Sequence, residues 1–205
     1  MLTIHGMADS GNCYKPRLLM ALLGRPFRHV AVSTLDGGTR QPAFLAANPN
    51  GKVPLLELDD GRTLPESNAI LCYLGDGTRF VPDDRFARAE MLGWMFFEQY
   101  SHEPHIAVRR SLLVAPQLRQ AATPQRLADT LAGGHKALAV MEQRLGAAQW
   151  LVGDAPSLAD IALYAYTHRA GEGGFELTDY PGIRAWLARI EALPDYRPIG
   201  WLPGA

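Results

Sequence analysis

The spacing of apolar residues changes near residue 75, and this change limits the folds that the chain can adopt. Up to that point, strand-like and helix-like stretches follow one another in the order β-α-β, a variable segment, and β-β-α. Beyond it the strand signals nearly vanish, and helical patterns remain. The sequence therefore predicts a small α/β domain followed by an all-helical domain.

Turn residues bound the elements expected in the first domain. Strands are expected at residues 2–6, 28–32, 53–58 and 62–64, and helices at residues 15–23 and 67–74. Gly24 and Gly75 end the two helices, and the Asp60-Gly61 pair predicts a hairpin between the last two strands.

A segment rich in glycine, proline and acidic residues, 77–84, is the expected linker between the domains 1–76 and 85–205. Helices are expected at residues 85–115, 125–145, 157–169 and 183–193. Pro104 predicts a kink or break in the first of these, and the glycine pair at 133–134 weakens the middle of the second.

Composition excludes several classes of function. The 205 residues carry 20 basic and 21 acidic side chains, whereas a nucleic-acid or anionic-membrane binder needs a basic excess. Apolar runs of at most six residues are too short to span a bilayer, and no signal-peptide pattern opens the chain. Its two cysteines, Cys13 and Cys72, form neither a disulfide framework nor a metal motif. We therefore expect a cytoplasmic protein without a metal.

Three local motifs follow one another along this chain. The first is Asn-Pro-Asn-Gly-Lys-Val-Pro at residues 48–54, where a proline at the start of a strand marks an edge or a special turn. A cis bond between Val53 and Pro54 would turn the main-chain groups of Val53 outward, where they can pair with an extended peptide.

The other two motifs open helices. Glu66 and Ser67 precede an apolar run, and N–H groups at such a helix start favour a bound carboxylate. The run Ser-Leu-Ala-Asp at residues 157–160 has the spacing of a capping box, with aspartate in place of the usual glutamate.

Together, the three motifs resemble those of the cytosolic glutathione transferase family, and the resemblance covers essentially the whole chain. It implies a thioredoxin-like N-terminal domain, an all-α C-terminal domain and a homodimer. It also implies that glutathione binds in the first domain as a co-substrate. The stretch at the start of the first helix is similar to that of bacterial members with serine or asparagine there.

The resemblance also implies roles for five residues. Val53, beside the cis proline Pro54, would pair with the cysteinyl backbone of glutathione. Ser67 would hold the γ-glutamyl carboxylate and Glu66 would face the ammonium group, while Lys52 would reach the glycyl carboxylate. A solvated surface lysine and a simple helix cap are the alternative interpretations of Lys52 and Ser67.

Such an enzyme must ionise the glutathione thiol, and three residues are candidates for that task. Alignment through the helix places Ser10 where serine-type transferases keep their hydroxyl. Alignment through Pro16 instead places Asn12 where cysteine-type bacterial enzymes carry their cysteine, and its amide can also bind a thiolate. Cys13 would form a mixed disulfide if exposed, or pack as a small buried residue.

An aromatic and polar stretch at residues 94–106 is the candidate wall of the second-substrate site. The alternative interpretation of this stretch is that it belongs to the core between packed helices. A shared helical face is expected for Glu98, His102, His105 and Arg109, with Tyr100 nearby. We interpret this face as a wall of the pocket or as charges at a dimer interface, because no metalloenzyme signature fits it.

The leading hypothesis is therefore a detoxifying transferase, in which the glutathione thiolate attacks a small, electrophilic, largely apolar acceptor. One alternative is a glutathione-dependent peroxide or disulfide reductase. Another is a non-catalytic glutathione-binding or stress-associated interaction protein on the same fold.

Overall fold

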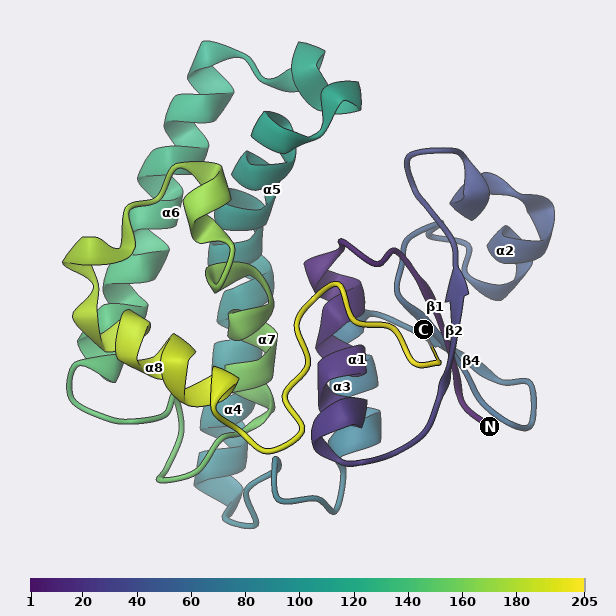
Figure 1. Ribbon diagram of the computed structural model, residues 1–205, viewed down its shortest axis with the longest axis horizontal. Coiled ribbons are helices and arrows are strands. Elements are labelled where there is room, and N and C mark those ends of the chain that lie inside the picture. Colours follow the sequence, from purple (N-terminus) through teal and green to yellow (C-terminus); the bar gives the residue numbers. More distant parts are fainter. Residues whose placement is uncertain (205) are drawn as a thin grey trace. The chain divides into compact units, whose positions relative to one another are not determined.

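The computed structural model describes residues 1–204, which form two compact units. The first unit comprises Met1–Asp76 together with the residues from Leu193 onward, and the second comprises Gly77–Ala192. A small mixed sheet with helices makes up the first unit, and helices make up the second (Figure 1). The predicted thioredoxin-like plus all-α fold class is confirmed.

The sheet of the first unit has four short strands in the order β2-β1-β3-β4. The strands are β1 (Thr3–Gly6), β2 (Arg28–Ala31), β3 (Leu55–Glu57) and β4 (Thr63–Pro65). β1 pairs with β2 in parallel, whereas β3 is antiparallel to both β1 and β4. Ile4 lies opposite Leu56 in this ladder, and both side chains are fully buried, so the centre of the sheet is part of the core.

Helices α1 (Gly11–Leu22) and α3 (Ser67–Gly75) pack against each other, and α1 also contacts β1. The helix α1 begins earlier than predicted because Ser10 caps it, whereas its first turn carries no apolar periodicity. Within the segment that the sequence leaves variable, the short helices η1 (Gly38–Arg40) and α2 (Pro42–Ala47) contact each other.

The C-terminal segment belongs to the first unit, although the sequence predicts that the helical domain extends to residue 205. The Tyr14 hydroxyl, on α1, donates to the Arg197 carbonyl at 2.6 Å. Figure 1 shows this yellow segment beside α1. Its hydrogen-bonded contacts use main-chain oxygen atoms, which any residue supplies, so side-chain patterns carry no signal of them.

Arg17 links the C-terminal segment to the loop that precedes α1 through hydrogen bonds. Its fully buried guanidinium donates through Nη2 to the Ala8 carbonyl at 2.6 Å and to the Ile199 carbonyl at 3.0 Å. Nη1 lies 3.5 Å from the Trp201 carbonyl. Burial lowers the pKa of Arg17. The carbonyl oxygens replace the water lost by Nη1 and Nη2, whereas Nε is buried without a partner among the described residues.

The second unit consists of five main helices with short helical turns between them (Figure 1). The main helices are α4 (Arg85–Phe97), α5 (Glu103–Val114), α6 (Pro124–Leu145), α7 (Leu158–Thr167) and α8 (Pro181–Glu191). The turns are the π-helical η2 (Glu98–His102) and the 3-10 helices η3 (Pro116–Ala121), η4 (Ala170–Gly173) and η5 (Leu177–Asp179). Helix α6 packs against α5 and α8, and α7 packs against α4. Across residues 1–204, no helix combines the length and apolar character that crossing a bilayer requires.

The kink or break predicted at Pro104 takes the form of the π-helical turn η2. Pro104 lies in the first turn of α5, immediately after this turn. A π turn inserts an extra residue into the helix and rotates everything that follows it. Side chains before and after η2 therefore do not share the face that uniform helical spacing predicts.

The glycine pair in α6 permits close packing and does not break the helix. A methyl group at Gly133 would overlap the His105 ring, and one at Gly134 would overlap the Phe175 ring. The cost of glycine in a helix is therefore offset by the approach of these two rings.

The predicted capping box is present at the start of α7. The buried Asp160 carboxylate accepts hydrogen bonds from the Ser157 N–H (2.8 Å) and hydroxyl (2.9 Å). It also accepts from the Leu151 N–H (3.1 Å) and from the Trp186 indole (2.9 Å). Burial raises the pKa of Asp160, while these donors act in the opposite direction.

Replacing Asp160 with asparagine tests this junction. The asparagine amide presents an NH2 group to donors that bind a carboxylate oxygen in the wild type. Buried N–H groups therefore lose their acceptor in the variant. We expect the free energy of unfolding, measured by urea denaturation, to fall by about 3 kcal/mol. The exposed Asp154→Asn exchange should change it by less than about 0.5 kcal/mol. Equal effects of the two exchanges would contradict this assignment.

Candidate active site

The N-terminal ends of α1 and α3 are joined by a network of polar side chains. The Ser67 hydroxyl donates to Asn12 Oδ1 at 3.1 Å. Lys15 Nζ donates to the Ser67 hydroxyl oxygen and to Asn68 Oδ1, both at 3.2 Å. The structure thus brings together two predicted site residues, Asn12 and Ser67, and adds Lys15 to them.

Ser10 caps α1 at the same end of the helix. Its half-buried side chain accepts a long hydrogen bond, 3.4 Å, from the Cys13 N–H. The Ser10 side chain also forms a hydrogen bond that favours the charged form of the Cys13 thiol, so a ligand anion at this helix end would compete with Cys13 for the Ser10 hydroxyl proton. The helix dipole adds a partial positive charge here, which favours an anion such as a thiolate.

Cys13 is fully buried, and its environment favours the packing interpretation. Its Sγ accepts a hydrogen bond from the Met7 N–H at 3.4 Å, and a methyl group at Gly6 would overlap it. Burial raises the pKa of the Cys13 thiol, so the reactive thiolate form is disfavoured. Cys72 is half-buried and free, and burial raises the pKa of its thiol as well.

The turn before β3 leaves an open stretch of backbone. The Val53–Pro54 peptide bond is cis. Asn48 fixes the turn, because its Nδ2 donates to the Lys52 carbonyl at 2.8 Å and its own carbonyl accepts from the Gly51 N–H at 2.9 Å. Among the described residues, the N–H and C=O of Val53 have no hydrogen-bond partner. They are the groups that an added extended peptide would pair with.

At the start of α3, Glu66 adopts a conformation that is rare for residues other than glycine. Its φ angle is 71°, and its side chain is exposed. Left-handed backbone at such a residue costs free energy and is concentrated at functional sites. Ser67 follows it as the first residue of α3, and its N–H has no partner within residues 1–204. This N–H is a free donor at the positive end of the helix.

Two cations of this region went unnoticed in the sequence. Lys15 is fully buried, although its place beside polar residues at the start of a helix is typical of a surface lysine. Arg40 lies with its guanidinium against Gly51, in the turn that carries Lys52. Neither position belongs to a recognisable motif, so only the folded chain reveals them.

The π turn divides the face predicted for the second substrate. The fully buried His102 forms a hydrogen bond with Thr167 through Nε2 at 2.9 Å. Arg109 donates to the Gly173 carbonyl at 2.6 Å and to the Leu127 carbonyl. These contacts join helices of the second unit, so both residues have structural partners there.

Tyr100 and His105 line a pocket of about 490 Å³ in the second unit. The pocket lies along η2 and α6, and Lys136 and Val140 are among its other lining residues. Tyr100 is 86% exposed. Of the predicted second-substrate residues, the structure therefore brings together Tyr100 and His105, but not His102 and Arg109.

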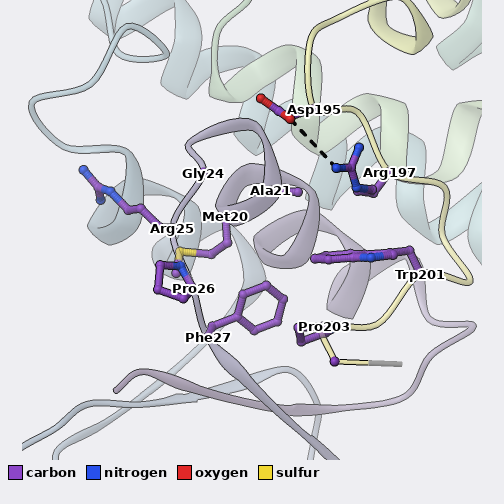
Figure 2. Close-up of a pocket in the computed structure, with 11 residues that line it drawn as sticks. Met20, Ala21, Gly24, Arg25, Pro26, Phe27, Asp195, Arg197, Trp201 and Pro203 are labelled. Atoms are coloured by element: carbon purple, nitrogen blue, oxygen red, sulfur yellow. Dashed lines mark ion pairs between the residues drawn. The ribbon is translucent and has the colours of Figure 1, made fainter.

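A second pocket, of about 340 Å³, lies in the first unit where the C-terminal segment meets α1 (Figure 2). Phe27 and Trp201 meet edge to face in it, with ring centres 6.0 Å apart. Arg197 lies beside Trp201 and 3.8 Å from Asp195. None of the candidate glutathione-binding or thiol-activating residues lines it. Within residues 1–204 no three histidine, cysteine or acidic side chains gather as they would around a metal ion.

Comparison with known protein families assigns both parts of the chain. Residues 9–76 match the family model described as glutathione S-transferase, N-terminal domain. Residues 95–194 match the model described as glutathione S-transferase, C-terminal domain. The two matches cover the polar network at α1 and α3 and the helical unit from residue 95 onward.

Individual relatives agree with the family models. The chain is 32% identical to a maleylacetoacetate isomerase of Pseudomonas aeruginosa, over 92% of this chain and 90% of that protein. A crystal structure of a glutathione S-transferase from Pseudomonas fluorescens is 49% identical, with a TM-score of 0.93 over 97% of this chain and 98% of that one. A glutathione transferase from Burkholderia graminis, crystallised with two glutathione molecules per subunit, is 26% identical. Its TM-score is 0.81 over 95% of this chain and 85% of that one. Fold, motifs and relatives agree, and the chain belongs to the glutathione S-transferase family.

Proposed function

We propose that this protein is a glutathione transferase, in which the first unit binds glutathione and lowers the pKa of its thiol. The observation that carries this proposal is the polar network that joins the starts of α1 and α3. The open main-chain groups of Val53 supply the peptide-binding edge that a tripeptide needs. The glutathione-bound relative from Burkholderia graminis supports the choice of ligand.

The charges of glutathione match the groups that the site offers. Val53 pairs with the cysteinyl backbone, and the Ser67 N–H at the start of α3 receives the γ-glutamyl carboxylate. The exposed Glu66 carboxylate faces the ammonium group. Lys52 and Arg40, which flank the same turn, attract the glycyl carboxylate.

The chemical step begins with ionisation of the bound thiol. The Ser10 hydroxyl donates a hydrogen bond to the sulfur, and the N-terminus of α1 adds a positive potential, so the thiolate is stabilised. The thiol proton passes to solvent water. The thiolate then attacks a small, electrophilic, largely apolar acceptor, and its electron pair forms the new carbon–sulfur bond while the bond from that carbon to a leaving group breaks and the leaving group departs with the bonding pair. Because Cys13 is buried, the reactive sulfur is that of glutathione.

Exchange of Ser10 for alanine tests the proposed thiol donor. We expect the pKa of the bound glutathione thiol, measured from the ultraviolet absorbance of the thiolate, to rise by about one unit. Turnover of a model electrophile should fall about tenfold. Ser111→Ala is the matched control in the second unit, and it should leave both quantities unchanged. An unchanged thiol pKa in Ser10→Ala would refute the role of Ser10, and disulfide-reductase turnover lost only in Cys13→Ala would favour the redox alternative.

Lys52 gives a second test, directed at the glycyl end of glutathione. Since Lys52 is exposed, its ion pair with the carboxylate should be modest, and Lys52→Met should weaken glutathione binding about fivefold. Glutathione esterified at the glycyl carboxylate should bind the wild type and Lys52→Met equally well. Calorimetric titration measures all four affinities. A loss that persists with the ester would show that Lys52 contacts another part of the ligand.

The protein is further proposed to act in the cytoplasm as a homodimer. The surface that supports a dimer is the pocket along η2 and α6, where Tyr100 is 86% exposed and Val140 is 45% exposed. Apolar side chains exposed together in this way are typical of an interface with another chain. A second copy would cover the rings and methyl groups there.

Replacing Tyr100 with glutamate tests the dimer. A carboxylate buried in the interface without a partner would be costly, so the mass measured by light scattering should fall from two chains to one. Val114→Glu, an exposed apolar position at the end of α5, is the control and should remain dimeric. A wild-type protein that is monomeric at micromolar concentration would contradict the homodimer.

A further inference from the structure

We propose that the pocket of the first unit binds a planar aromatic carboxylate. This pocket, of about 340 Å³, is formed by the end of α1, the loop that follows it and the C-terminal segment (Figure 2). All of its lining residues belong to the first unit. Its volume lies at the lower end of the usual range for small-molecule sites. The candidate glutathione-binding residues lie elsewhere, so this inference does not depend on the proposed function.

Apolar side chains form much of the lining. Met20 and Phe27 are buried, and Pro26 and Pro203 present rigid rings to the same space (Figure 2). Apolar surface of this kind favours a ligand whose body is apolar. Proline side chains have little rotational freedom to lose, so covering them costs little entropy.

Two aromatic rings give the pocket a preference for a flat ligand. Phe27 and Trp201 meet edge to face, with ring centres 6.0 Å apart and an angle of 69° between their planes. The indole of Trp201 is partly exposed, so a third ring can contact it. Aromatic rings gain free energy from offset stacking and from edge-to-face contact, and a rigid planar ligand loses little conformational freedom on binding.

Arg197 supplies the positive charge of the site. Its Cζ lies 6.0 Å from the centre of the Trp201 ring. Nη1 donates to the Tyr196 carbonyl at 2.9 Å, whereas Nη2 lies 3.8 Å from Asp195 Oδ1, which is longer than a hydrogen bond. Among the described residues Nε has no hydrogen-bond partner. Nε and Nη2 form the pair of donors that a carboxylate binds with both oxygens.

Arg25, the other cation of the lining, is engaged elsewhere. Its Nη1 donates to the Leu74 carbonyl at 2.9 Å, and Figure 2 shows its guanidinium turned outward, away from Trp201. A carboxylate in the pocket is therefore bound by Arg197. Since Arg25 carries the same charge and lines the same pocket, it provides a matched control.

Asp195 competes with a ligand for Arg197. The two side chains are 63% and 43% exposed, and an ion pair as open as this is weak. A ligand carboxylate at hydrogen-bond distance would replace it. The φ angle of Asp195 is 64°, which asparagine also tolerates, so Asp195→Asn removes the competing charge and keeps the turn.

A flat aromatic ring system and one negative charge define the ligand. 2-Naphthoate combines the two, and 2-naphthamide keeps the shape without the charge. Glutathione does not match this pocket, because it has an ammonium group and more than one carboxylate but no aromatic ring.

Calorimetric titration with these two compounds tests the site. Arg197→Met should weaken the binding of 2-naphthoate about tenfold, because hydrogen bonds to a charged group are lost, and should leave 2-naphthamide unaffected. Asp195→Asn should tighten the binding of 2-naphthoate about threefold. Arg25→Met should change it by less than about twofold. Decahydro-2-naphthoate, which has the same skeleton and charge but no aromatic ring, should bind the wild type about fivefold more weakly.

A wild-type protein that does not bind 2-naphthoate at millimolar concentration would overturn the inference. An affinity that Arg197→Met leaves unchanged would place the compound at another site, and equal losses in Arg25→Met and Arg197→Met would reveal a general effect of charge; either result overturns it. Equal binding of 2-naphthoate and its saturated analogue would refute the preference for a planar ring. Glutathione takes no part in these titrations, so failure of the proposed function would leave their outcome intact.

Discussion

A single buried guanidinium connects the parts of the first unit that must stay in register for a ligand to bind. Arg17 donates to the Ala8 carbonyl, in the loop that leads to Ser10, and to the Ile199 carbonyl in the C-terminal segment. A buried charge of this kind is tolerated only while its acceptors remain in place. The position of the loop, the cap of α1 and the packing of the C-terminal segment therefore depend on one another. Loss of any of these acceptors would leave a charge in a region without water.

The candidate site uses backbone geometry and helix ends more than reactive side chains. In the proposed function, the open groups of Val53 and the N–H of Ser67 would recognise a peptide-like ligand, and the start of α1 would supply the positive potential that stabilises an anion. Chemistry of this type requires no acid–base pair, since the nucleophile arrives with the ligand. The burial of Cys13 is consistent with a nucleophile that comes from the ligand, because the protein's own thiol is not accessible to a substrate.

Sequence patterns predicted most elements of the fold, and they indicated Asn12 and Ser67, which the structure brings together at the candidate site. Strand alternation, the capping box at Asp160 and the turn before Pro54 are local, and each depends on residues close together in the chain. Contacts of long range were missed. The burial of Lys15 depends on where α3 packs, and the separate surroundings of His102 and His105 depend on the π turn between α4 and α5. Neither the burial of Lys15 nor the presence of the π turn produces a regular spacing of residues that can be recognised in the sequence.

The first unit is built from two stretches of chain, and the whole helical unit lies between them in the sequence. During translation the ribosome therefore releases the sheet, α1 and α3 long before the carbonyls of Ile199 and Trp201, with which Arg17 forms hydrogen bonds. Until then, the guanidinium lacks acceptors that the finished structure provides. The first unit therefore reaches its full set of contacts only after the residues that follow the second unit have been made. A fragment that stops before Leu193 would keep every residue of the candidate glutathione site and still lack the segment that completes the unit.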